Sequence, residues 1–238
     1  MTSRSPRATG AAMVEFVVVA LPLLLLAGAT FETYRWMLAR QAAGYALYEA
    51  ARAGTAAGAD PSAIAQAFAR ALSPALAIAP GPDPDAQAQA VHARLRTWSG
   101  AHQGLRMARI EQLSPVAASF RDFPAPPSGT AHGRELDYDY QRLHHDTVYL
   151  ARYRGGVGPR SGQTLFEANT LALRLTYLHA PYLPGMQALL RRLADASESD
   201  DYVRQARAAG LIVIRREIAM PMASAAREHG KARDLLAP

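Results

Sequence analysis

The chain has 238 residues, no cysteine and a formal net charge of +6. This length allows one membrane helix and one domain of ordinary size, and the absence of cysteine excludes disulfides, thiolate nucleophiles and cysteine metal sites. The basic residues are scattered among acidic ones, as at positions 215–217 (RRE), and form no dense block. The sequence therefore predicts a mildly basic, solvated surface and no nucleic-acid partner.

The N-terminus is a short basic segment followed by a long apolar run. Residues 1–10 contain Arg4 and Arg7, and residues 11–31 read AAMVEFVVVALPLLLLAGATF. At about 1.5 Å per residue, a helix over this run spans roughly 30 Å, the thickness of the hydrocarbon core of a bilayer. We expect a transmembrane helix with its N-terminus in the cytoplasm, because basic flanks tend to stay on that side.

Three interpretations fit this segment. It can be a secretory signal peptide with residues 27–29 (AGA) as the cleavage site, a plain signal anchor, or a prepilin-type leader that is cut after Gly10. Glu15 distinguishes them, because a carboxylate at membrane depth costs roughly 3 kcal/mol. A cut after Gly10 creates an ammonium group on Ala11, one helical turn before Glu15, and this charge compensates the carboxylate. In the alternative, Glu15 simply extends to the lipid headgroups.

The stretch GAAMVEFVVVALPLLLLAGATFE resembles the opening of TadE-like proteins, the minor pseudopilins of the tight-adherence (Flp-type) pilus system. In that family a glycine is followed by four residues, then a glutamate, an aromatic residue and a leucine-rich run with a proline. Here these positions are Gly10, Glu15, Phe16 and Pro22. The resemblance implies cleavage by a prepilin peptidase between Gly10 and Ala11, with Glu15 and Phe16 acting in recognition and assembly.

Pro22 lies in the middle of the apolar run. Proline removes one helical hydrogen bond and clashes with the preceding turn, so we expect a kink there. The kink either helps the helix to bend during extraction from the membrane or is a tolerated membrane proline.

The helix is expected to continue past the membrane as a stem over residues 32–56, with Gly54 and Gly58 marking its end. Apolar and aromatic side chains at helical spacing form one sector of this stem, which we expect to be core. They are Phe31, Tyr34, Leu38, Tyr45 and Tyr48.

Short elements follow in the remaining chain. Asp60 and Pro61 have the residue types of an N-cap and a first helical position, which predicts a helix over 61–72, and a second helix is expected over 86–98. Alternating apolar residues predict strands over 105–113, 170–182 and 211–220, with further helices over 185–194 and 202–208. We expect loops over 79–84 and 123–134, low order over 135–162, and a helical or frayed tail.

A second region also resembles the TadE-like family. Residues 165–177 fit its stretch L-x-x-A-N-x-L-x-x-R-x-T-Y, and residues 220–224 resemble its closing strand less specifically. The expected fold class is α+β: a long N-terminal transmembrane and stem helix packed on a small antiparallel sheet with extra short helices, which is pilin-like. The expected domains are a basic leader (1–10), a transmembrane helix (11–31), a helical stem (32–56) and a periplasmic α+β domain (57–238).

No residue pattern predicts catalysis, a metal site or a cofactor. His144, His145 and Asp146 form the densest cluster, but adjacent side chains diverge on a helix or a strand and make a poor shared metal site. The acid pairs at 137/139 and 200/201 are interpreted as solvated or helix-start charges. We therefore do not expect an enzyme.

The expected function is that of a minor pseudopilin-type protein in the bacterial inner membrane, with its C-terminal domain in the periplasm. Its expected partners are the membrane, other pilin or pseudopilin subunits, the pilus assembly machinery and a prepilin peptidase, and incorporation in a surface pilus is compatible with this function. The alternative is a signal-anchored or secreted periplasmic protein with a binding or hydrolytic function.

Overall fold

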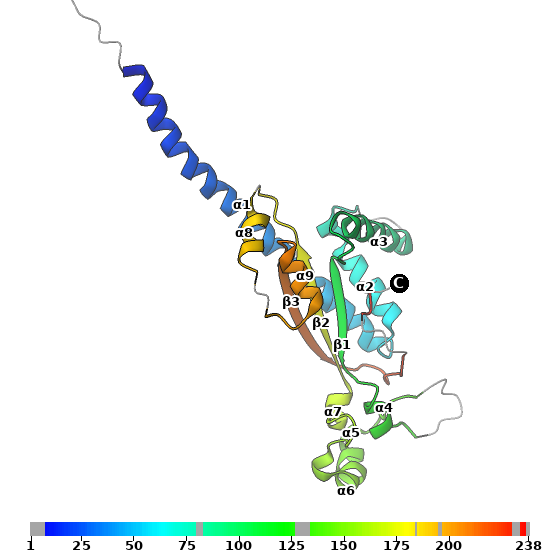
Figure 1. Cartoon of the computed structure of the whole chain (residues 1–238). Coiled ribbons are helices and arrows are strands. Elements are labelled where there is room, and N and C mark those ends of the chain that lie inside the picture. The colour runs from blue at the N-terminus through cyan, green and yellow to red at the C-terminus, as the bar shows by residue number, and fades with distance from the viewer. Residues whose placement is uncertain are drawn as a thin grey trace, which may run out of the picture.

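The computed structural model describes residues 8–79, 83–126, 134–183, 185–194, 197–229 and 234–236, apart from the side chains of residues 8–12 and 84. A single long helix projects from an α+β body, which consists of a three-stranded sheet and shorter helices (Figure 1). The predicted fold class is thus confirmed.

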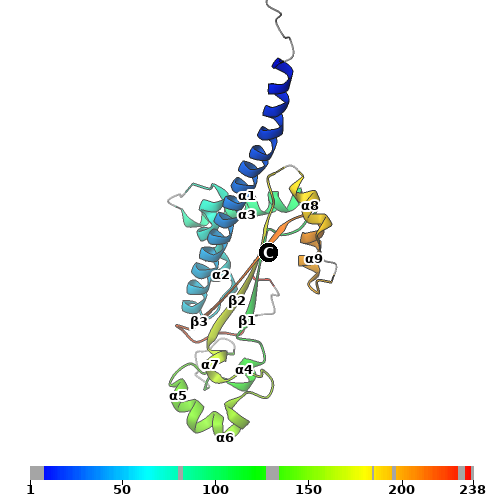
Figure 2. The same cartoon turned by 90° about the vertical axis from the view of Figure 1, so that its left-hand side faces the viewer.

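Helix α1 (Ala8–Ala56) has 49 residues and two different halves. Its N-terminal half projects away from the body, and its C-terminal half lies along the sheet (Figure 2). The side chains of the projecting half are apolar and exposed, as for Leu24 at 70%. This is the one described helix that is long and apolar enough to cross a membrane. The helix is continuous through Pro22.

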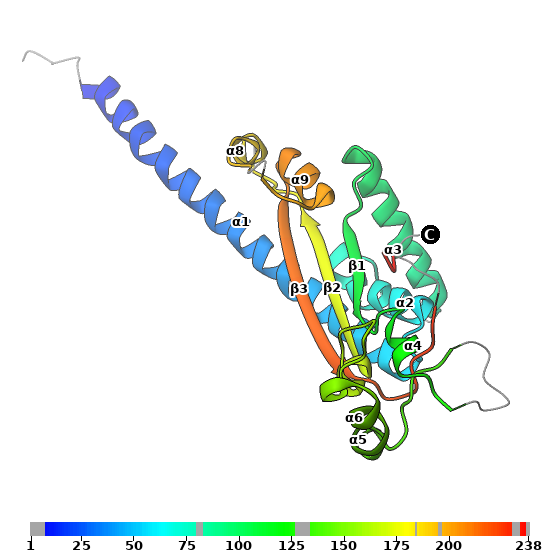
Figure 3. The ribbon, with the colours of Figure 1, turned by 60° about the horizontal axis from the view of Figure 1, so that its bottom comes forward.

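The sheet is antiparallel with the strand order β1–β2–β3 (Figure 3). The strands are β1 (Ala108–Ser114), β2 (Thr170–His179) and β3 (Ile212–Pro221). In the register of the central strand, Leu175 pairs with Ile110 on one side and with Arg216 on the other. All three strands were predicted from alternating apolar residues, and their bounds differ from the expected ones by a few residues.

The predicted helices after the stem are also present. They are α2 (Pro61–Leu72), α3 (Pro84–Ala101), α8 (Met186–Arg192) and α9 (Asp201–Ala208). Asp60 caps α2 as expected, because its carboxylate accepts a hydrogen bond from the backbone N–H of Ser62 at 3.2 Å. A 3₁₀ turn, η1 (Ser73–Leu76), follows α2.

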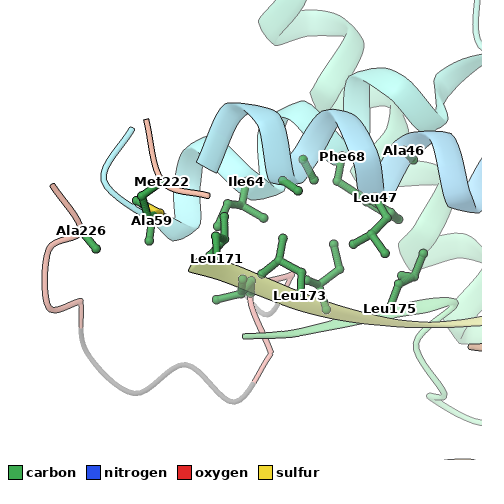
Figure 4. Close-up of a cluster of buried hydrophobic side chains, with 14 of the residues drawn as sticks. Ala46, Leu47, Ala59, Ile64, Phe68, Leu171, Leu173, Leu175, Met222 and Ala226 are labelled. Carbon is green, nitrogen blue, oxygen red and sulfur yellow. The ribbon is translucent and has the colours of Figure 1, made fainter. Parts of the chain in front are cut away.

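The core lies between the C-terminal half of α1, α2 and one face of the sheet (Figure 4). Helix α1 contributes mainly alanines and Leu47, and β2 contributes Leu171, Leu173 and Leu175, each fully buried. Small side chains let the helix approach the strand closely. At Gly54 a Cβ would lie 2.7 Å from Ile64 Cγ1 and 2.8 Å from Leu171 Cδ2. Gly54 therefore serves close packing inside α1, whereas the sequence suggested that it ends the helix.

The prediction that the aromatic sector of the stem is core was wrong. Its five side chains are 45–59% exposed, and we call this surface the aromatic stripe: Phe31, Tyr34, Leu38, Tyr45 and Tyr48. The buried side of the stem is instead the alanine side, with Ala43, Ala46 and Ala50 at 0% exposure. Periodicity identified a coherent helix face, but the sheet packs on the opposite face, where most side chains are alanines that allow a close approach.

Residues 134–162 form a defined lobe, in contrast to the predicted low order. It contains α5 (Gln141–His144), a π-helical turn η2 (His145–Tyr149), α6 (Leu150–Arg152) and η3 (Arg154–Gly156), and it lies near α4 (Ser119–Asp122) and α7 (Leu165–Ala168). The buried Asp122 carboxylate holds the glycine-rich loop by accepting the backbone N–H groups of Arg160 at 3.0 Å and Ser161 at 2.7 Å.

Two predicted irregular segments lie partly outside the described residues. The expected loops over 79–84 and 123–134 are described only at 79, 83, 84, 123–126 and 134. The described tail residues, 222–229 and 234–236, form no helix and are packed, with Ala226 at 0% and Leu235 at 6% exposure. The expectation of a helical or frayed tail was therefore wrong for these residues.

Candidate functional site

The predicted processing and assembly residues lie in the first turns of α1. The structure places Gly10 and Ala11 within the helix and leaves Glu15 exposed, with Phe16 71% exposed. Glu15 follows Ala11 by four residues, a rise of about 6 Å that puts both positions on one side of the helix. The Glu15 side chain thus lies one helical turn after Ala11, on the same side of the helix.

The aromatic stripe continues the exposed apolar surface of α1 beyond the membrane-length segment. Tyr34 is 59% exposed and Tyr45 58%, although both lie on the half of the helix that packs on the sheet. Exposed aromatic residues on one helix face are typical of surfaces that bind another protein or a membrane. The helix therefore has one face for its own sheet and another that is largely exposed in this chain.

A buried polar contact joins α1 to the loop after β2. Glu32 is 5% exposed, and its Oε2 accepts the backbone N–H of Tyr182 at 2.9 Å. Its Oε1 lies 3.4 Å from Nε2 of His179, which is 6% exposed. Burial lowers the pKa of His179, and Arg35 adds to this lowering, whereas Glu32 opposes it. A neutral imidazole can donate its Nε2 proton to the carboxylate.

Glu32 and His179 were not predicted as a contacting pair from the sequence. A signal was present, because Glu32 has the same helical phase as Trp36, Ala43 and Ala50 on the buried side of α1. Without the fold, however, the partner on the loop after β2 could not be recognised.

A second polar cluster joins the lobe to Asn169, at the end of α7 just before β2. The Asp137 carboxylate, at 4% residue exposure, accepts the Tyr149 hydroxyl at 2.8 Å and contacts Nδ1 of His144 at 2.8 Å. Asn169 donates to the Asp137 carbonyl oxygen at 2.8 Å. Burial raises the pKa of Tyr149, and the hydrogen bond to Asp137 adds to this. The interpretation of Asp137 as a solvated charge was therefore wrong, and the Asn169 of the second family-like stretch has a structural role.

The two histidines of the predicted cluster, His144 and His145, contact different carboxylates. His144 contacts Asp137, and Nδ1 of His145 lies 3.0 Å from Asp146 Oδ1. Among the described residues, no group of three or more histidine, aspartate or glutamate side chains could hold a metal ion. As predicted, Asp200 begins a helix by accepting the backbone N–H of Tyr202 at 3.0 Å, but it also forms an ion pair with Arg109.

A groove of about 850 Å³ lies between α2, α3 and β1. Ala65, His92, Leu95 and Met107 line it, and the described tail residues Leu235 and Leu236 close one side. The backbone N–H of Leu235 donates to the Ile110 carbonyl oxygen at 2.9 Å, so the tail covers part of the open edge of β1. The lining of this groove is mostly apolar, and no hydrogen bond joins His92 to a hydroxyl group among the described residues.

The comparison with known protein families finds one match: residues 10–52 match the family model described as TadE, TadE-like protein. Neither the curated proteins nor the solved structures contain a match to the chain. The matched residues comprise nearly the whole of α1, including Gly10, Glu15 and Pro22. TadE-like proteins are components of a pilus system and are not known as an enzyme family. The similarity to the TadE-like family is thus found over residues 10–52, which form most of α1.

Proposed function

We propose that the chain is a minor pseudopilin-type protein of the Tad (Flp-type) pilus or a related secretion filament. In this proposal a prepilin peptidase cuts after Gly10 on the cytoplasmic side. Residues 11–31 then span the inner membrane, residues 32–56 form a stem, and the body lies in the periplasm. Other pilin or pseudopilin subunits and the assembly machinery are its partners.

The exposed Glu15 is the observation that carries the proposal. Its carboxylate lies on a surface that is otherwise apolar, one helical turn after Ala11, where it costs roughly 3 kcal/mol in a lipid environment. A new ammonium on Ala11 offsets this cost, either within one chain or between adjacent chains. Without cleavage, no such positive charge exists at that position.

The aromatic stripe supports the assembly part of the proposal. An apolar helix surface that runs from the membrane segment into the stem can pack against the α1 helix of another subunit without disturbing the alanine side. In a pilin-like assembly, Phe16 and the aromatic stripe would lie on this shared surface, and Pro22 would let the projecting half bend.

The signal-peptide alternative requires cleavage near residues 27–29. Gly28 in this segment lies against Leu183 of the body, because a Cβ there would be 3.0 Å from Leu183 Cδ2. A cut here would remove part of a helix that contacts the folded body. This contact favours a protein that retains its apolar helix.

Mass spectrometry of the protein purified from membranes tests the proposal. The full chain is expressed with and without a prepilin peptidase, as wild type, Glu15→Ala and Glu15→Gln. We expect a mature N-terminus at Ala11 only with the peptidase, and loss of this product in both variants. Phe31→Ala serves as a matched control outside the recognition segment and should be processed normally. An N-terminus at Met1 in the presence of active peptidase, or at Thr30, contradicts the proposal.

A further inference from the structure

The body touches α1 inside the membrane-length apolar run. The run ends at Phe31, and Gly28 lies three residues earlier, about 5 Å deeper along the helix. Leu183, in the loop after β2, lies directly against Gly28. If the apolar run fills the hydrocarbon core, this loop must therefore reach the boundary between the lipid headgroups and the acyl chains.

Several contacts hold the loop at this level. The Glu32 carboxylate accepts the backbone N–H of Tyr182 at 2.9 Å. The rings of Phe31 and Tyr182 meet edge to face with centroids 6.4 Å apart, and the Arg35 guanidinium lies 5.3 Å from the centroid of the Tyr182 ring. The height of the loop along α1 is therefore determined by packing and hydrogen bonds.

Helix α8 follows this loop, at the end of the body nearest the projecting half of α1 (Figures 1 and 2). The loop and α8 together expose Tyr182 at 73%, Leu189 at 51% and Leu193 at 70%. Arg192 is exposed beside them. We call these four residues the α8 patch.

The α8 patch has the composition of an interfacial membrane surface. Tyrosine prefers the headgroup region because its ring is apolar and its hydroxyl is polar. Leucines gain free energy by entering the outer acyl region, and an arginine beside them can extend to lipid phosphates. Three exposed apolar side chains on a protein surface would by themselves need no explanation. Here it lies beside the point where a membrane-length helix enters the body.

We propose that the α8 patch lies on the bilayer surface and is a second membrane contact of the protein, in addition to α1. Tyr182, Leu189 and Leu193 enter the boundary between headgroups and acyl chains, and Arg192 binds lipid phosphate. Two contacts restrict the tilt and rotation of the body, whereas a single helix leaves both free. The inference depends on α1 as a membrane span and is independent of any role in a pilus.

Spin labelling of the full chain in vesicles tests this contact. Because the wild-type chain contains no cysteine, one introduced cysteine carries the only label. The test variant is Leu193→Cys. Val19→Cys, at 58% exposure in the wild type, reports the membrane span, and Leu143→Cys, at 57%, reports the lobe at the opposite end of the body. The vesicles contain phosphatidylethanolamine and phosphatidylglycerol.

Power saturation compares the accessibility of each label to oxygen, which concentrates in lipid, with its accessibility to a water-soluble nickel chelate. We expect the oxygen-to-nickel ratio at position 193 to approach that at position 19 and to exceed that at position 143 several-fold. A ratio at 193 equal to that at 143, with position 19 still in lipid, refutes the contact while leaving the membrane span intact. The label at position 193 can also be shielded from both oxygen and the nickel chelate. If this shielding increases with the protein-to-lipid ratio, a protein covers the α8 patch and the proposal is wrong.

The charge of Arg192 provides a second readout. Arg192→Glu in the Leu193→Cys chain should lower the oxygen-to-nickel ratio at position 193 in phosphatidylglycerol vesicles, because a carboxylate is repelled by the anionic surface. Arg204→Glu, on α9, is the matched charge reversal and should leave the ratio unchanged. An equal ratio with and without Arg192→Glu refutes the phosphate contact.

Discussion

Two neighbouring residues of the stem separate packing within the chain from packing between chains. Leu47 is 2% exposed and lies in the core against β2, whereas Tyr45 is 58% exposed on the aromatic stripe. Leu47→Ala removes three buried carbons, a loss of about 2.4 kcal/mol at about 0.8 kcal/mol each. The unfilled cavity brings the expected loss in the free energy of unfolding to about 2–5 kcal/mol. Tyr45→Ala should change it by less than about 0.5 kcal/mol.

Urea unfolding of the full chain in detergent micelles, followed by fluorescence of Trp36 and Trp98, measures both values. Cross-linking in membranes that contain the pilus machinery then compares the association of each folded variant with other subunits. We expect Tyr45→Ala to lose association while remaining as stable as the wild type. A loss of stability in Tyr45→Ala similar to that in Leu47→Ala would show instead that the aromatic stripe packs within its own chain.

Three further results are expected. Glu32→Ala should lower the free energy of unfolding by about 1–3 kcal/mol in urea titrations, because it removes the carboxylate that accepts the Tyr182 N–H; an unchanged value would exclude this contact as a stabilising one. The pKa of His179 is lowered from 6.5 in the folded chain, so the unfolded chain binds a proton at a higher pH than the folded chain does. The stability that neutral His179 contributes is therefore complete above about pH 6.5. It is lost as the pH falls through the pKa of the folded chain. Unfolding measured between pH 7.5 and pH 5 should show this loss, and His179→Gln should weaken the pH dependence; an equal dependence in both chains contradicts the assignment. Gly54→Ala should destabilise the chain, because the new Cβ would lie less than 3 Å from Ile64 and Leu171. Gly44→Ala has no neighbour closer than 3.9 Å and should stabilise the chain by up to about 1 kcal/mol. Thermal unfolding in which both substitutions shift the melting temperature in the same direction would contradict the close packing of α1.

Features that depend on local chemistry could be predicted from the sequence. A run of 21 mainly apolar residues is long enough to span a bilayer, so the helix and its single acid at Glu15 could be recognised without a fold. Alternation of apolar residues identified the three strands, and Asp60 with Pro61 identified the start of α2, because strand faces and helix caps are set by neighbours in the chain. The TadE-like resemblance at the N-terminus likewise depends only on residues that are close together in the chain.

Which faces and charges are buried depends on how the segments pack in the folded chain. A helix with an aromatic side and an alanine side can pack by either, and only the close approach of the sheet at Gly54 selects the alanine side. Asp137 looks like a solvated acid in the sequence, yet it is buried because the lobe folds back and brings the Tyr149 hydroxyl to it. Glu32 is buried because its donor, the Tyr182 N–H, comes from a segment 150 residues away. Such partners meet only when the chain has folded, so residue patterns along one segment carry no information about them.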